Sequence, residues 1–208
     1  MSGSLGLLEQ AKQSVAARIG NVAPTLLDSE MRWVLDDFLR TTRVWRKPLT
    51  ITMVPGQADY PLEIEDYESA VGLLQATYGG FPVGLYIQRT SYAQTGSPAW
   101  AGLLTDRILR VYPLPSTTTT EVMKIEVYMT LLPTMNVVPP DELRPYYRAM
   151  VEGLLARMLE MADKPWFNLK AAMMAAANYD TFKAEVRIQV DRGRAVTSQR
   201  VVFPRHGF

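Results

Sequence analysis

Residues 138–167 read VPPDELRPYYRAMVEGLLARMLEMADKPWF, and this stretch decides the helical part of the fold. The prolines at its start bar helical extension backwards, and Asp141 is placed to accept the free amide hydrogens of a first turn. From there apolar residues recur at steps of three and four positions, which predicts one helix running to about Ala162. These residues are Leu143, Tyr147, Met150, Val151, Leu154, Met158 and Met161.

A second helix is predicted over residues 168–190, after a proline-containing break. A glycine in mid-helix costs about 1 kcal/mol relative to alanine, so Gly153 in the first helix indicates a close approach by another backbone. We therefore predict a helical hairpin in which Gly153 packs opposite Ala172 and Ala176, and in which Trp166 fills the corner. The predicted inner face of the second helix is Ala172, Ala175, Ala176, Tyr179, Phe182, Val186 and Val190.

The chain after this helix is basic. From Lys183 to Phe208, six Lys and Arg residues stand against two acidic residues, a net charge of +4 in a chain whose total is +1. We expect the helix to stop near Gly193 and residues 192–208 to form an extended arm, which is too short of local contacts to fold alone. Its basic and apolar side chains are Arg192, Arg194, Arg200, Val201, Val202, Phe203, Arg205 and Phe208.

Two further helices are expected at the N-terminus. The first covers about residues 5–19 and ends at Gly20, and the second is capped by Asp28 or Ser29 and continues to about Trp45. The second helix has an inner stripe of Met31, Val34, Leu35, Phe38, Leu39 and Thr42. We predict that the N-terminal helices (1–46) and the C-terminal hairpin (135–191) pack together as one bundle.

The periodicity changes between these two helical parts. Short alternating runs separated by turn residues fill residues 47–134, which is typical of antiparallel strands. The expected strands are 49–54, 70–78, 83–88, 100–104, 108–112 and 121–131. The predicted fold class is therefore α+β: a helical bundle with an inserted small antiparallel β-sandwich or barrel module and an extended C-terminal arm.

The chain lacks the catalytic residues that most classes of enzyme require. It has no cysteine, and His206 is its single histidine, so thiolate, triad and imidazole metal sites are not expected. No phosphate-binding or dinucleotide-binding glycine motif occurs. We expect no cofactor, no metal and no catalytic residue. No apolar run approaches the length that spans a bilayer, and near-neutral total charge argues against autonomous nucleic-acid binding.

Two alternatives stay open at this point. Glu63 and Glu65 would share one strand face near Asp66 and Glu68, an arrangement that would allow a carboxylate-dependent hydrolase. Aromatic residues would instead suit a carbohydrate- or receptor-binding module, although most of them are expected in the strand core. They are Tyr60, Tyr67, Tyr78, Tyr86, Tyr92, Trp100 and Tyr112.

Taken in order, several motifs make the chain similar to the head-to-tail adaptor (connector) proteins of short-tailed bacteriophages. The ordered set covers most of the chain. It consists of Phe38, Thr41-Thr42-Arg43-Val44-Trp45-Arg46, the strand and turn Leu49 to Leu62 with Pro55-Gly56-Gln57-Ala58-Asp59-Tyr60-Pro61-Leu62, Arg110-Val111-Tyr112-Pro113-Leu114-Pro115, Val138-Pro139-Pro140-Asp141-Glu142-Leu143, Gly153 and Lys164-Pro165-Trp166.

The resemblance implies a structural virion protein assembled in the host cytoplasm as a ring, commonly a dodecamer, beneath the portal. The arm 192–208 would dock on the portal, and the β module would contact neighbouring copies and the tail nozzle or tail fibres. The ring would continue the channel for packaged DNA without specific contacts. We expect the free protein to be a monomer or weak oligomer, because the sequence shows no long apolar stripe left uncovered.

Overall fold

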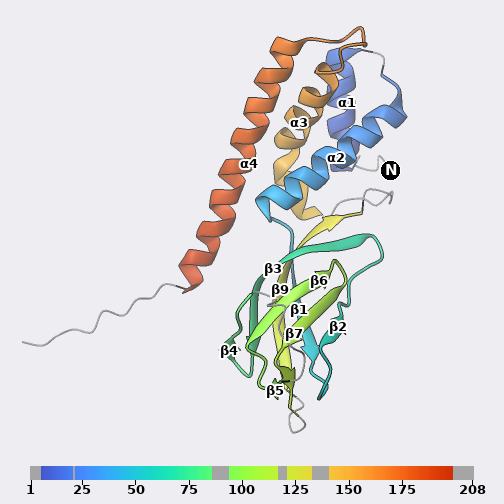
Figure 1. The fold of residues 1–208 in the computed structure, drawn as a ribbon. Coiled ribbons are helices and arrows are strands. Elements are labelled where there is room, and N and C mark those ends of the chain that lie inside the picture. The colour runs from blue at the N-terminus through green and yellow to red at the C-terminus, as the bar shows by residue number, and fades with distance from the viewer. Residues whose placement is uncertain (1–5, 21, 86–93, 117–120, 133–140, 199–208) are drawn as a thin grey trace, which may run out of the picture. The chain divides into compact units, whose positions relative to one another are not determined.

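In a computed structural model, residues 6–20, 22–85, 94–116, 121–132 and 141–198 are described. The chain divides into two compact units, residues 1–44 with 144–208 and residues 45–143 (Figure 1). The first, called the helical unit, contains α1 (Leu7–Ile19), α2 (Pro24–Thr42), α3 (Tyr147–Leu159) and α4 (Leu169–Ser198). The second, called the β unit, contains β1 (Arg46–Thr52), β2 (Asp59–Pro61), β3 (Glu68–Tyr78), β4 (Phe81–Pro82), β5 (Thr95–Gly96), β6 (Trp100–Thr105), β7 (Ile108–Tyr112), β8 (Leu114–Pro115) and β9 (Val122–Leu131).

The two N-terminal helices form as predicted, but α2 has different ends. α1 stops at Gly20, whose φ of 93° suits a residue without a side chain. α2 begins at Pro24, so the predicted cap at Asp28 or Ser29 is wrong. Proline is favoured at the first helical position because its fixed φ fits and its missing N–H would have had no partner there. At the other end Arg43 adopts a left-handed conformation, which ends α2 before Trp45.

The C-terminal helices also form, with two corrections to their bounds. Asp141–Tyr146 is a 3-10 segment containing Pro145, so the α-helix starts at Tyr147 and the predicted start at Asp141 is wrong. A proline in the first turns removes an amide donor and disfavours helical geometry in the residue before it. α4 continues to Ser198, so residues 192–198 are helical and the predicted extended arm is wrong for this part. Residues 199–208 lie outside the described residues.

Trp166 lies in the corner between α3 and α4 and binds the end of α3. Its indole Nε1 donates to the carbonyl O of Met158 at 2.9 Å, and the backbone N–H of Asn168 donates to Leu159 O at 3.0 Å. The Asn168 side chain then accepts from the N–H of Ala171 at 3.0 Å, inside the first turn of α4. These bonds satisfy backbone groups that helix ends otherwise leave without partners.

Buried apolar residues of the described helices hold the helical unit together. The predicted inner stripe of α2 is buried in full, and Ala11 and Val15 of α1 are fully buried. The Phe38 and Tyr146 rings lie 5.3 Å apart between centroids, which joins α2 to the chain just before α3. The N- and C-terminal helices therefore pack together, as the periodicities predict.

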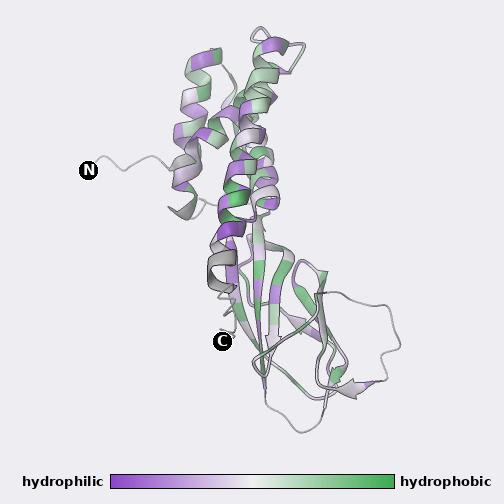
Figure 2. Ribbon diagram, turned by 90° about the vertical axis from the view of Figure 1, so that its left-hand side faces the viewer, coloured by the Kyte–Doolittle hydropathy of each residue, from purple (hydrophilic) through white to green (hydrophobic). Residues whose placement is uncertain are grey.

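The β unit consists of small sheets around its own core. A four-stranded antiparallel sheet has the order β1-β9-β3-β4, a three-stranded antiparallel sheet the order β2-β7-β6, and β5 pairs with β8 in parallel. Hydrophobic residues alternate with polar ones along the long strands (Figure 2), and the buried cluster takes residues from both antiparallel sheets, such as Val127 and Val111. The described strands close no barrel, so the barrel alternative is wrong, while the predicted antiparallel pairing is confirmed for the two larger sheets.

Candidate interaction surfaces

Gly153 of α3 lies where α2 and α4 both approach that helix closely. A Cβ atom added there would lie 2.6 Å from Val34 Cγ1 of α2 and 3.0 Å from Tyr179 Cε2 of α4. The glycine is therefore at a close approach between three helices. Its nearest neighbours are Val34 and Tyr179, where the sequence led us to expect Ala172 and Ala176. Of these two alanines, the first is buried and the second half-buried.

Tyr179 ties one flank of α4 to α2. Its hydroxyl donates to Val34 O at 2.8 Å, and burial raises the pKa of this phenol. Lys183 Nζ lies 4.4 Å from the centre of the Tyr179 ring and 2.8 Å from Asp37 Oδ2. Burial would lower the pKa of Lys183, but its hydrogen bonds to Asp37 and Asp180 outweigh burial and raise the pKa. This lysine therefore stays charged and pairs α4 with α2.

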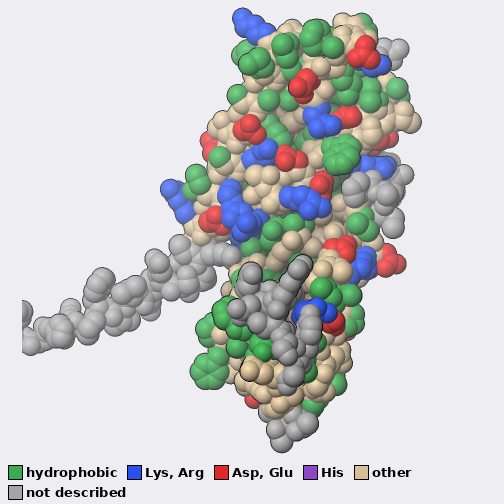
Figure 3. Space-filling view, in the orientation of Figure 1, with side chains coloured by type: hydrophobic (Ala, Val, Ile, Leu, Met, Phe, Trp, Pro, Cys, Tyr) green, Lys and Arg blue, Asp and Glu red, His purple; other side chains and the backbone are tan. Residues whose placement is uncertain are grey.

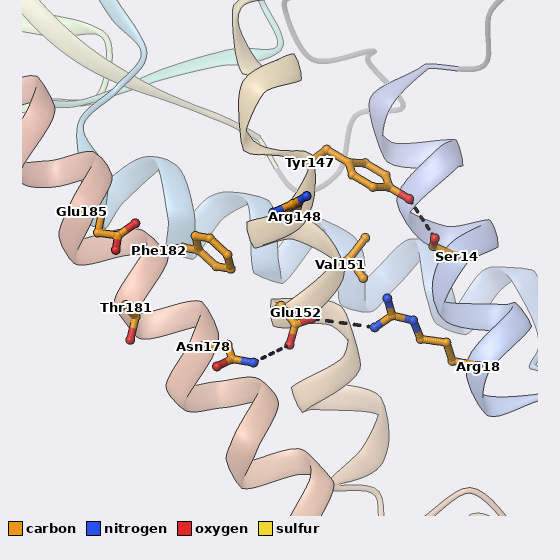
Figure 4. A pocket seen from close by; sticks show the side chains of 10 residues that line it. All are labelled: Ser14, Arg18, Tyr147, Arg148, Val151, Glu152, Asn178, Thr181, Phe182 and Glu185. Atoms are coloured by element: carbon orange, nitrogen blue, oxygen red, sulfur yellow. Dashed lines mark hydrogen bonds and ion pairs between the residues drawn. The ribbon is translucent and has the colours of Figure 1, made fainter.

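On the opposite flank of α4, a hollow with a volume of about 580 Å³ opens between α1, α3 and α4 (Figure 4). The side chains that line it come from all three helices, and those of Arg18, Glu152 and Asn178 reach toward one another across the space between them. They are Ser14, Arg18, Tyr147, Arg148, Val151, Glu152, Asn178, Thr181, Phe182 and Glu185.

Glu152 links the walls of this hollow. Its Oε2 accepts from Asn178 Nδ2 of α4 at 3.2 Å, and its Oε1 lies 3.7 Å from Arg18 Nη1 of α1. Arg148 and Glu185 also line the hollow, and neither has a hydrogen bond or ion pair within the part of the chain that the structure describes. Charges of both signs beside amides and hydroxyls suit a polypeptide segment better than a nucleic acid, which requires a basic face.

Sequence reasoning missed the hollow. Polar residues on the outer side of a predicted helix are usually solvated, and nothing local shows that two such helices lie side by side. Tyr147 Oη donates to Ser14 Oγ at 2.8 Å across 133 residues of sequence. Only this long-range packing brings the polar faces of α1 and α3 together.

The predicted docking residues fall at and beyond the end of α4. Arg192 is exposed on this helix. Arg194 lies in the same helix, without a described side chain. The remaining ones, Arg200, Val201, Val202, Phe203, Arg205 and Phe208, lie outside the described residues.

The acidic residues of the β unit do not form the predicted strand face. β2 ends at Pro61, so Glu63 and Glu65 follow the strand and are exposed. Glu68 is only 5% exposed, and its Oε2 lies 2.7 Å from Lys47 Nζ and accepts from the N–H of Glu65 at 2.9 Å. An ion pair and a backbone bond therefore use this carboxylate to hold β1, β3 and the preceding turn together.

Several aromatic residues of the β unit are part of its buried core. Tyr60 and Tyr78 are buried, and the Tyr60 hydroxyl donates to Val54 O at 3.0 Å. Trp100 is exposed at the start of β6, and Tyr86 and Tyr92 lie outside the described residues. Carbohydrate stacking requires exposed ring faces, so the two buried tyrosines are not available for it.

Asp59 of β2 and Arg110 of β7 lie opposite each other and form a bidentate ion pair, in which Arg110 Nη2 lies 2.6 Å from Asp59 Oδ2. The hydrogen bonds from Arg110 lower the pKa of the Asp59 carboxyl below its ordinary value. Because the folded pKa is the lower one, the pair stabilises the fold above about pH 4, and this contribution is lost as pH falls through the folded pKa.

We therefore expect Asp59→Asn to lower the melting temperature at neutral pH and to make this temperature less sensitive to pH below about pH 4. Thermal unfolding of both proteins across the acid range measures this. Asp66→Asn is the matched control, because the Asp66 side chain is 96% exposed and lies 3.6 Å from Arg107. Equal losses in the two variants would contradict the role given to Asp59.

No group of three His, Cys, Asp or Glu side chains in the described ranges could hold a metal ion. None of the described helices is long and apolar enough to cross a membrane.

Comparison with known proteins gives one family. The family model described as SU10 adaptor protein matches residues 7–202, which includes both compact units. No curated protein matches the chain. The match confirms the resemblance to phage head-to-tail adaptors that the ordered motifs indicated.

Proposed function

Because the chain belongs to the SU10 adaptor protein family, a family of phage head-to-tail adaptors, we propose that its copies form a ring beneath the portal. As an adaptor it is a structural virion protein that binds other virion components such as the portal and the tail, and the family implies no enzymatic activity. The observation that carries the proposal is the family match over residues 7–202. We propose a dodecameric ring, closed by repeating one contact between neighbours.

Each part of the chain has a proposed task in this ring. The end of α4 with residues 199–208 docks on the portal, and the β unit contacts neighbouring copies and the tail nozzle or fibres. The ring continues the channel through which packaged DNA passes. Over the helices in Figure 3, Lys and Arg side chains are interspersed with Asp and Glu. Such a mixed surface supports passage of DNA, since a basic wall would bind phosphates and retain the duplex.

The proposed function is tested by mixing the purified chain with the portal of the same phage. We expect the two to sediment together, and class averages of negatively stained particles to show a second ring on one side of the portal ring. A portal ring that stays bare when the chain is in molar excess would overturn the proposal.

A further inference from the structure

The outer face of α4 is apolar, and none of the described residues covers it. Residues at steps of three and four positions form one stripe on the side away from the buried Ala172, Ala175 and Tyr179. This α4 stripe consists of Met173, Met174, Ala177, Thr181, Ala184 and Ile188. The two methionines are 66% and 63% exposed and the isoleucine is 49% exposed. None of the six residues is charged, over a length of about 24 Å.

The stripe overturns the premise on which we expected a monomer. A solvent-facing helix side normally carries charged residues, and an uncovered apolar stripe marks an interaction site. Of the charged residues nearby, Lys183 pairs with Asp37 and Arg187 with Asp191 on one flank of α4, and Glu185 lies on the other flank, beside the hollow. A partner can therefore cover the stripe without leaving these charges unpaired.

The helical unit also exposes the large aromatic side chain of Trp33, besides that of Phe167 before α4. Trp33 is 56% exposed on the side of α2 opposite the buried Met31, Val34 and Phe38 stripe. The charged residues in the next turn are paired within the unit. Arg40 Nε lies 2.8 Å from Asp36 Oδ1, and Asp37 binds Lys183 as described above. The Trp33 face therefore resembles the α4 stripe, with an apolar centre and internally neutralised charges.

We propose that the α4 stripe of one copy binds the Trp33 face of a second copy of this chain. Small side chains, those of alanines and a threonine, occupy the middle of the stripe between the methionines and Ile188, so a protruding indole can approach the helix closely there. Methionine side chains adapt their shape to such a partner, and tryptophan is a common anchor of protein interfaces. The charges that are paired within each copy beside these two faces keep their partners in this contact.

The contact is heterologous, because it joins two different faces of the same chain. A heterologous contact repeats from copy to copy and closes into a ring when its rotation allows. The inference rests on the proposed ring and adds to it which surfaces meet. A contact between one helix face and one tryptophan face buries less surface area than a typical stable interface. The pair should therefore associate and dissociate in solution at micromolar concentrations.

Sedimentation velocity of the full chain across the micromolar range tests the contact. We expect the wild type to sediment faster as concentration rises, and Ala177→Glu to weaken this association about tenfold or more, since the new carboxylate would lose its water against the partner. Gln189→Glu adds the same charge to an exposed position outside the stripe and is the matched control. Unchanged melting temperatures would show that both variants fold.

A mixing experiment separates this contact from a symmetric one. Trp33→Ala should also fail to associate alone. A mixture of Ala177→Glu with Trp33→Ala should form a one-to-one pair and nothing larger, because it contains one intact stripe and one intact Trp33 face that can meet. A stripe packed against another stripe would give no such rescue.

Three outcomes would overturn the inference: a wild type that stays monomeric, an Ala177→Glu variant that associates normally, or no rescue in the mixture. Each leaves the proposed function standing if the wild type still sediments with the portal. Failure of the portal experiment with an intact self-association would reject the proposed function and leave this contact in place.

Discussion

Gly153→Leu is expected to lower the free energy of unfolding by about 1–3 kcal/mol, as overpacking of a well-packed site does. A Cβ atom at this position already comes within 2.6 Å of Val34 Cγ1, and a leucine adds three more carbons. Val34 cannot turn aside easily, because a β-branched side chain in a helix has one strongly preferred rotamer. Tyr179, on the other side, is held by its hydrogen bond to Val34 O. The helices would have to separate.

Gly193→Leu is the matched control for this prediction. Gly193 lies in α4 with no atom within 4 Å of an added Cβ, so leucine there should be neutral or stabilise the helix by up to about 1 kcal/mol. Urea unfolding of the two variants and the wild type gives the change in the free energy of unfolding that each substitution causes. A Gly153→Leu variant that unfolds at the wild-type urea concentration would show that the three helices do not meet at this glycine.

The helices could be predicted from sequence because their signals are local. The stripe from Met31 to Thr42 repeats at helical spacing, and every residue in it is buried. The helix bounds were less accurate, because competing signals lie close together. Asp28 is a good cap by type, but Pro24 starts the helix earlier and leaves Asp28 free to pair with Lys12 of α1. The end of α4 was missed because glycine is common where helices stop, although Gly193 within a helix costs only about 1 kcal/mol.

The surfaces proposed for interaction depend on packing that the sequence does not show. Met173 and Ile188 could have faced the core, since apolar residues occur on several sides of α4. Only the positions of Tyr179 and Val186, which are buried, show that the stripe faces outward. Gly153 was recognised as a close approach from its residue type alone. Its neighbour Val34 could not be foreseen, because the contact spans more than half of the chain and depends on how α2 crosses α3.

Truncation after Ser198 is expected to abolish attachment to the portal and to leave the melting temperature unchanged. The removed segment, residues 199–208, contains Arg200 and Arg205 on either side of the apolar run Val201-Val202-Phe203. Such a segment can bind by strand addition or by inserting into a groove, with Phe203 as the anchor and the arginines paired to acidic portal residues. The helices and strands that the structure describes all end at or before Ser198, so we expect them to form without the removed residues.

Three variants separate the parts of this docking segment. The Ser198 truncation should weaken binding to the portal about a hundredfold or more, and Phe203→Asp, which keeps both arginines, should have nearly the same effect if the anchor dominates. A longer truncation after Asp191 also removes the last turns of α4 with Arg192 and Arg194. Any further loss of affinity for the portal measures how much these turns contribute to binding. Binding is measured by co-sedimentation with portal rings, beside a thermal melt of each variant. The ordering of a segment on its partner affects affinity and not the stability of the free chain. A Ser198 truncation that melts normally and still sediments with the portal would show that docking uses another surface.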